Sequence, residues 1–311
     1  MRILTYAVRK AMALAASQPG NHQHEPQQHR EEDLVACAHT EENTQEPAAK
    51  RARRDDTHDE KEDAVYLSRE DFPTEMEKYW AQRKRLFSRF DQGIKMDKES
   101  WYSVTPEAIA KQIAHRARCK LVVDGFCGAG GNAIQFAFTC DKVIAIDKDP
   151  NKIKLARSNA AIYGVAHKIE FICADFLAWM ADLSSAQIAS IDVVFLSPPW
   201  GGMDYLQPSD PDSCDESSHY YKLAQLEPID GLELFKRACT ISQRIIFYLP
   251  RHLDLHDLAR LAELLPSPSD PQHFPIEVEE NWMNQKCKAL TVYFGPLVSN
   301  TQSSPSLNHS S

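Results

Sequence analysis

The chain contains one short stretch that combines rigid backbone, an aromatic ring and glycine. Ser197-Pro198-Pro199-Trp200-Gly201-Gly202 directly follows the apolar run Ile191–Leu196. The prolines fix φ and carry no N–H, and the glycines let a ligand approach the backbone closely. Carbonyls left free there can accept hydrogen bonds from an amino group, beside the flat ring of Trp200. Taken alone, the stretch is equally typical of a Pro-Gly turn anchored by a tryptophan.

A second candidate site lies earlier, where glycines follow another apolar run. The segment Asp124–Gly131 reads D-x-F-x-G-x-G-G, and Asp147 ends the next apolar run, 23 positions after Asp124. Gly128 and Gly130 let the backbone approach a ligand, and Asp147 can accept from both hydroxyls of a ribose. Because Asp124 would repel a pyrophosphate and attract a cation, the pattern favours S-adenosyl-L-methionine over a dinucleotide.

Two further features bear on this cofactor site. Asp175 follows the third apolar run, where it can accept from the adenine amino group or cap the next helix. The eight cysteines occur singly, without a C-x-x-C pair, which indicates reduced thiols and no structural zinc. Methyl transfer from a sulfonium needs alignment more than acid–base chemistry, so the sequence predicts no metal.

Alternating apolar strands and helices must position these residues. The pattern predicts an α/β fold, a doubly wound Rossmann-like sheet of the class I methyltransferase type with an N-terminal helical extension. Thr105 is expected to cap a helix that starts at Pro106 and runs to about Ala117. The strands are expected at 120–124, 142–146, 168–173, 191–196, 244–249, 276–280 and 290–294, and the helices between them at 131–138, 150–163, 176–183, 231–240 and 253–265.

Composition divides the chain into four parts. Residues 1–63 and 297–311 are expected to be disordered tails, because they are polar and poor in aromatic residues. Residues 64–118 form the helical extension, and residues 119–296 form the methyltransferase domain. Residues 203–228 are expected to form a long acidic loop. No apolar run is long enough for a membrane span, which predicts a soluble protein.

Charge is unevenly spread, so the net charge of −9 neither requires nor excludes nucleic acid. Basic residues alternate with aromatic residues between Lys78 and Lys95, as suits binding of phosphates and bases. The alternative is an amphipathic helix with a solvated basic face. In the first tail, Lys50–Arg54 resembles a nuclear import signal, and residues 1–17 faintly resemble an organelle transit peptide.

Together these motifs resemble one family, the trimethylguanosine synthases, which methylate N2 of a 7-methylguanosine RNA cap. The resemblance covers about Lys78 to Gly295, and SPPWGG together with KYWAQR is its most specific part. It implies an enzyme that uses S-adenosyl-L-methionine to convert the cap of small RNAs to 2,2,7-trimethylguanosine. It also implies capped RNA of the snRNA or snoRNA class and ribonucleoprotein proteins as partners. The expected location is the nucleus, including nucleolus or Cajal bodies, with a cytoplasmic fraction. The protein is expected to be a monomer.

The resemblance assigns roles to individual residues. Ser197 and Pro198 would lie against the acceptor amine, and Trp200 would stack on the methylated guanine, which is a cation. The residues implied to hold the cap phosphates are Lys78, Tyr205, Arg251 and Lys288. Those implied to contact the cofactor are Phe87, Ser103, Thr105, Asp124, Asp147 and Asp175, beside the glycines at 128 and 130.

Two other functions fit the residues less well. One is an N2-guanine or N6-adenine methyltransferase that acts on internal nucleotides. The other is a non-catalytic adaptor that binds the cap. The intact cofactor segment, with Asp124, Gly128, Gly130 and Asp147, argues against the adaptor, because a protein that only binds the cap needs no cofactor loop.

Overall fold

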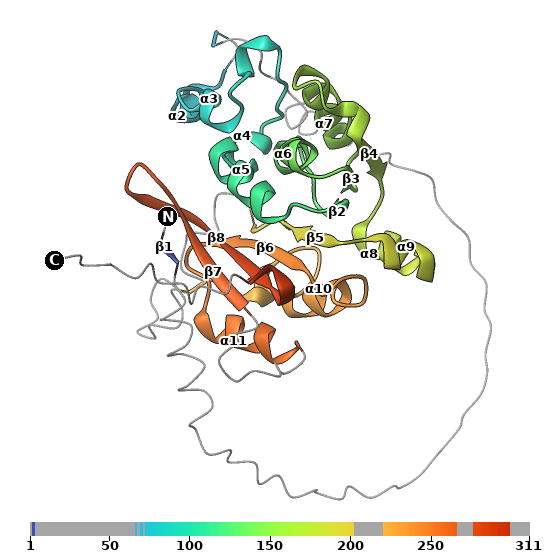
Figure 1. Ribbon diagram of the computed structural model, residues 1–311. Coiled ribbons are helices and arrows are strands. Elements are labelled where there is room, and N and C mark those ends of the chain that lie inside the picture. The colour runs from blue at the N-terminus through green and yellow to red at the C-terminus, as the bar shows by residue number, and fades with distance from the viewer. Residues whose placement is uncertain are drawn as a thin grey trace, which may run out of the picture.

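The computed structural model describes residues 2–3, 66, 69–70, 72–201, 220–265 and 276–298. Most of the first tail, the second tail from residue 299, and residues 202–219 with Tyr205 lie outside this part. The described residues form one mixed sheet with helices on both faces and a helical extension at one end (Figure 1). None of the described helices has the length and apolar character to cross a bilayer.

The sheet has the strand order β1-β7-β8-β6-β5-β2-β3-β4. Strands β2 to β6 run parallel, whereas β8, β7 and β1 continue the sheet in antiparallel fashion. Its strands are β1 (Arg2–Ile3), β2 (Leu121–Asp124), β3 (Lys142–Asp147), β4 (Ile169–Cys173), β5 (Val193–Leu196), β6 (Ile245–Pro250), β7 (Ile276–Met283) and β8 (Lys286–Phe294). The chain order reverses between β2 and β5, and ligands of open α/β sheets bind at such a point.

The helices follow the chain in the order expected for a doubly wound sheet. They are α2 (Glu77–Trp80), α3 (Arg83–Leu86), α4 (Ser100–Ser103), α5 (Glu107–Arg116), α6 (Gly131–Thr139), α7 (Pro150–Ile162), α8 (Phe176–Ala181), α9 (Ser185–Ser190), α10 (Gly231–Ala238) and α11 (Leu255–Glu263). Short 3-10 turns are η1 (Thr74–Met76), η2 (Phe90–Gln92), η3 (Ala166–Lys168), η6 (Leu223–Gln225) and η7 (Gly295–Leu297).

Two apolar layers hold the helices on the sheet. Helices α5, α6 and α7 cover one face together with the extension, and α8, α10 and α11 cover the other (Figure 1). The central strands are buried on both faces: in β5, Phe195 packs into the first layer and Leu196 into the second. A strand buried on both sides needs an unbroken apolar sequence, which is why these strands are readable as continuous runs.

The extension has an aromatic core of its own. The ring centroids of Phe72 and Trp101 lie 4.6 Å apart, and those of Trp80 and Phe90, which pack edge to face, lie 5.5 Å apart. A buried ion pair of 2.8 Å between Lys152 of α7 and Asp97 fixes this core to the sheet domain. The extension is therefore packed against the helix layer as part of the same folded body.

The structure corrects the expected start of the helix after Thr105. Helix α5 begins at Glu107 with Pro106 as its N-cap residue, and no side chain caps it. The Thr105 hydroxyl instead accepts a hydrogen bond of 2.9 Å from Asn132 Nδ2, in α6. Thr105 is thus used to join the extension to α6. Among the tail residues, Arg2–Ile3 pair with β7, and Leu297 is buried at the end of η7.

Candidate active site

The loop between β2 and α6 forms one side of the site. Gly128 and Gly130 have φ angles of 49° and 89°, which side chains rarely adopt. A Cβ on Gly130 would also lie 3.1 Å from Ala156 of α7, so only glycine fits this close approach. The amide of Gly128 donates to Asp147 Oδ2 at 2.9 Å, which joins the loop to the end of β3.

Asp124, at the end of β2, is completely buried. Its Oδ1 accepts a long hydrogen bond of 3.4 Å from the Phe126 amide, and its Oδ2 has no partner within the described part of the chain. Burial raises the pKa of Asp124 to about 7, and the nearby Asp147 carboxylate acts in the same direction. Because a buried, unpaired carboxylate is costly, a cation bound against it would be strongly favoured.

Two more carboxylates lie at the ends of the next two strands. Asp147 is the last residue of β3, and Asp175 follows the end of β4 by two residues. Asp147 accepts from the amides of Gly128 and Asp149, and burial still raises its pKa. A carboxylate has about four acceptor positions, so both oxygens can accept further hydrogen bonds from ribose hydroxyls. Asp175 is exposed and caps α8 through the Ala178 amide at 2.9 Å, which establishes the capping role and leaves adenine recognition a prediction.

The turn after β5 forms the opposite side of the site. Ser197 Oγ donates to the Phe126 carbonyl at 3.3 Å, so this turn and the glycine loop are in direct contact. Pro198 is buried and Trp200 is half-buried. The Trp200 ring packs against Tyr248 of β6, with centroids 5.4 Å apart and planes at 31°. Sequence reasoning missed Tyr248, although its position one residue before the end of the strand predicted at 244–249, next to the site, was a usable signal.

Three residues of the extension were expected at the cofactor. Phe87 is buried, and its Cζ lies 4.0 Å from the point where a Cβ on Gly131 would stand. Thr105 bonds Asn132, as described above. Both residues thus meet the first turn of α6, directly after the glycine loop, whereas Ser103 is exposed at the end of α4.

Two of the predicted phosphate ligands lie side by side. Arg251 follows β6, and its Nη1 donates to the Cys287 carbonyl at 3.2 Å, next to Lys288 in β8. Lys78 lies on a different element, α2, where it is exposed and its Nζ is 5.0 Å from the centre of the Tyr79 ring. The structure does not describe Tyr205, so its role stays a prediction.

The hairpin formed by β7 and β8 connects the extension, which carries Lys78, with the region of Arg251 and Lys288. Its tip, Asn284–Gln285, is a two-residue turn with φ angles of 48° and 62°. With its amide oxygen turned toward Arg85 of α3, Asn284 accepts two hydrogen bonds of 2.8 and 3.1 Å. The extension that carries Lys78 is therefore joined to the hairpin that carries Lys288.

Helix α7 supports both the extension and the glycine loop through one buried amide. Asn159 Nδ2 donates to the carbonyls of Lys95 and Ala129, at 2.9 and 3.0 Å, and its Oδ1 accepts from the Lys95 amide at 2.8 Å. Ala129 lies between Gly128 and Gly130. Asn159 was not predicted, because its three bonds reach residues that are 30 and 64 positions away along the chain.

The fold and this arrangement of loops define a Rossmann-like methyltransferase. The fold is shared with a solved structure titled "putative methyltransferase" from Porphyromonas gingivalis W83, at a TM-score of 0.51 and 16% identity over 74% of this chain and 52% of that one. The family profile "RNA cap guanine-N2 methyltransferase" matches residues 119–297.

Two curated proteins named trimethylguanosine synthase are also similar to the chain. The one from Schizosaccharomyces pombe is 41% identical over 201 residues, which cover 63% of this chain and 79% of that protein. The one from Saccharomyces cerevisiae is 36% identical over 200 residues, 61% of this chain and 59% of that protein. The chain therefore belongs to the RNA cap guanine-N2 methyltransferase family, which confirms the resemblance drawn from the sequence.

Proposed function

We propose that the protein converts a 7-methylguanosine RNA cap to 2,2,7-trimethylguanosine by methylating the N2 amine with S-adenosyl-L-methionine. The observation that carries this is the hydrogen bond between Ser197 and Phe126, which joins an amine-accepting turn to a glycine loop beside a buried carboxylate. A methyl donor and an amine acceptor must meet at such a junction.

The chain's residues fit this cofactor. The unpartnered Oδ2 of Asp124 suits the ammonium of the amino acid end, and Asp147 suits the ribose hydroxyls. When bound, S-adenosyl-L-methionine supplies an electrophilic methyl group on a sulfonium. Asp175 would accept from the adenine amine through the oxygen that is not used in the helix cap.

The acceptor is held by orientation rather than by a strong base. Carbonyls of the Ser197–Pro198 turn accept the N–H groups of the guanine amine, whose lone pair is delocalised into the ring. Trp200, held by Tyr248, offers its face to the positively charged base. A cation over a desolvated tryptophan gains about 2 kcal/mol, which separates a methylated guanine from a neutral one.

The test compares two capped RNAs that differ only in the methyl group at N7. With labelled S-adenosyl-L-methionine, the 7-methylated cap should accept label and the unmethylated cap should not. Equal labelling of both would contradict the role of Trp200, and labelling of uncapped RNA would favour a methyltransferase of internal nucleotides. Mass spectrometry of the product gives the number of methyl groups added.

A non-catalytic adaptor is disfavoured by Asp124. A buried carboxylate that binds nothing only destabilises the fold, so a protein without a cofactor has no use for it. Calorimetric titration with S-adenosyl-L-methionine decides this, since the adaptor predicts no binding.

The proposal extends to RNA class and location. Small nuclear and nucleolar RNAs are the proposed substrates, with the protein acting as a nuclear monomer that meets ribonucleoprotein proteins. The basic cluster Lys50–Arg54 supports nuclear import. If the cluster directs import, replacing its Lys and Arg residues by alanine should abolish nuclear accumulation of the protein. Light scattering of the purified protein measures its mass and so tests whether it is a monomer.

A further inference from the structure

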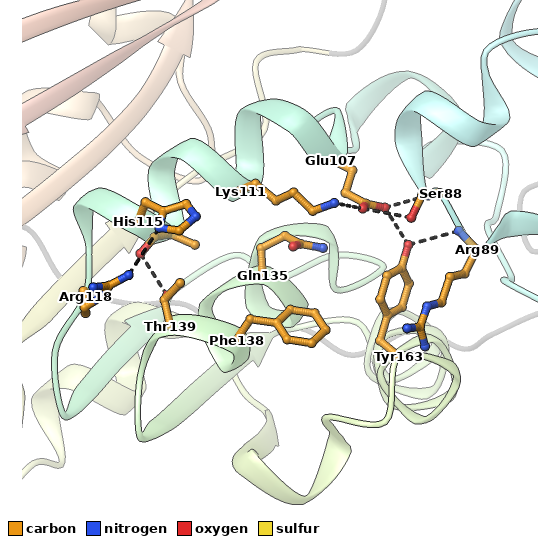
Figure 2. Close-up of a pocket in the computed structure, with 11 residues that line it drawn as sticks. Ser88, Arg89, Glu107, Lys111, His115, Arg118, Gln135, Phe138, Thr139 and Tyr163 are labelled. Atoms are coloured by element: carbon orange, nitrogen blue, oxygen red, sulfur yellow. Dashed lines mark hydrogen bonds and ion pairs between the residues drawn. The ribbon is translucent and has the colours of Figure 1, made fainter.

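A cavity lies outside the candidate active site, on the outer side of the helix layer. It has a volume of about 350 Å³ and lies between α5, α6 and the end of α7 (Figure 2). Figure 2 shows Lys111, His115 and Arg118 along one wall, and Phe138 and Tyr163 along the other. We call this cavity the helix groove. None of the residues assigned to cofactor or cap lines it.

The helix groove is positively charged. Arg89, Lys111 and Arg118 contribute three cations, and Glu107 is its single acidic residue. Glu107 is only 5% exposed, because it accepts from the Ser88 amide at 2.6 Å and from Tyr163 Oη at 2.6 Å. It is also paired with Lys111 at 2.6 Å. Its charge is therefore satisfied inside the protein, and the groove presents an excess of cations.

Two of these cations have no carboxylate partner among the described residues. Arg118 is exposed and contacts His115 Nδ1 at 3.4 Å. Arg89 lies over the Tyr163 ring, 5.1 Å from its centre, and uses one N–H to bond the Ile162 carbonyl. Guanidinium groups have five donors, so both can bind phosphate oxygens without losing these contacts.

An exposed aromatic ring accompanies the cations. Phe138 is 51% exposed at the outer face of α6, whereas its neighbours Phe136 and Ala137 are buried. The centres of the Phe138 and Tyr163 rings lie 6.4 Å apart with their planes at 71°, so the two rings do not stack face to face. Cations that track a backbone, together with an open ring for a base, are the two features of single-strand nucleic acid binding.

The helix groove adjoins residues that pack at the candidate active site. Arg89 and Ser88 at its end directly follow Phe87, which packs at the start of α6. Helix α3 lies beside α5, and its Arg85 bonds the hairpin that carries Lys288 (Figure 1). Through Arg85, α3 therefore joins the hairpin that carries Lys288 to the groove residues Ser88 and Arg89, while its Arg83 and Lys84 are paired with Asp91.

We propose that the helix groove binds the single-stranded RNA that follows the cap. The backbone phosphates would pair with Arg89 and Arg118, and one base would stack on Phe138. This rests on the proposed function in one respect, namely that the substrate is a capped RNA. It adds a second RNA site, away from the chemistry.

The first test measures binding without catalysis. Fluorescence anisotropy of the full chain with an uncapped RNA of about 16 nucleotides gives the dissociation constant and its salt dependence. Arg118→Gln should reduce the slope of log K against log salt by about 0.7, the value for one phosphate contact on a single strand. Phe138→Ala should weaken binding about tenfold. Lys236→Gln, an exposed change in α10 on the opposite face, is the control.

Binding that is unchanged in both groove variants, or changed as much in the control, would overturn the proposal, and a protein partner would then be the alternative for this surface. Thermal unfolding shows whether each variant is folded. Because the probe has no cap, this result does not depend on the proposed function.

The second test separates the two sites kinetically. The groove variants should raise KM about tenfold for a capped RNA of the same length and leave methylation of a capped dinucleotide unchanged. Equal losses on both substrates would overturn the proposal. If the parent protein itself methylates neither substrate, the proposed function is rejected. The anisotropy result alone would then decide whether the groove binds RNA.

Discussion

Replacement of Asp124 by asparagine should stabilise the free protein at alkaline pH. The pKa of this buried carboxyl rises from 3.8 to about 7 in the folded state. Below pH 3.8 both the folded and the unfolded state hold the proton, so the residue has no effect. Between pH 3.8 and about pH 7 only the unfolded state releases the proton, so the free energy of unfolding falls as the pH rises. At 1.36 kcal/mol per pKa unit, the full cost above pH 7 is about 4 kcal/mol.

An asparagine cannot ionise and therefore avoids this cost. Asp124→Asn should unfold at a higher urea concentration than the parent at pH 8, with a gap that shrinks toward pH 4. Asp141→Asn is the control, because Asp141 is exposed immediately before β3. A variant that is less stable at pH 8, or a gap that does not depend on pH, would refute the reasoning.

The same change should weaken cofactor binding. Only the ionised carboxylate pairs with the ammonium of S-adenosyl-L-methionine, so the affinity of the parent should rise from pH 6 to pH 8 and then level off. Asp124→Asn should bind at least tenfold more weakly at pH 8 and lack this pH dependence. Calorimetry at three pH values measures both effects, and an unchanged affinity would show that the cofactor does not reach Asp124.

Further substitutions test the other parts of the site. Trp200→Ala should lose about 2 kcal/mol of binding to a 7-methylguanosine nucleotide while cofactor affinity stays within twofold, and a parallel loss of both by calorimetry would mean that Trp200 is mainly structural. Asn159→Ala leaves the Lys95 and Ala129 backbone groups without their partner and should lower the free energy of unfolding by about 3 kcal/mol, measured in urea; a loss below 1 kcal/mol would show that water replaces the amide. Gln285→Gly relieves a left-handed φ of 62° and should stabilise the protein by about 1 kcal/mol, seen as a higher Tm; a lower Tm would show that the Gln285 side chain makes a stabilising contact.

The central sheet was readable from the sequence because its strands are buried on both faces. The runs expected at 120–124 and 191–196 coincide with β2 and β5 to within two residues. The last two strands were predicted too short. Strand β7 continues beyond residue 280 to Met283, and β8 begins at Lys286 rather than at residue 290. The half of this hairpin nearest its tip carries Asn281, Asn284 and Gln285. These polar residues interrupt the apolar pattern by which strands were recognised.

The site was readable where a local motif carries it. The glycine loop and the turn after β5 each reveal their chemistry within eight residues. Asn159 and Glu107 act through contacts with residues that are distant in sequence, and nothing in their neighbourhood marks them. Thr105 shows the opposite case, because its local pattern indicated a helix cap and a tertiary partner, Asn132, uses its hydroxyl instead.

Asn159 has a thermodynamic consequence. Its amide holds the extension at Lys95 and the glycine loop at Ala129, so the two predicted binding surfaces share one rigid support. A ligand that orders one surface lowers the entropy lost when the other binds, and this coupling is the same in both directions. The factor by which a cap nucleotide tightens S-adenosyl-L-methionine binding must equal the factor for the reverse order. Asn159→Ala should bring both factors toward one, and calorimetric titrations in both orders would show a persistent coupling if the support lies elsewhere.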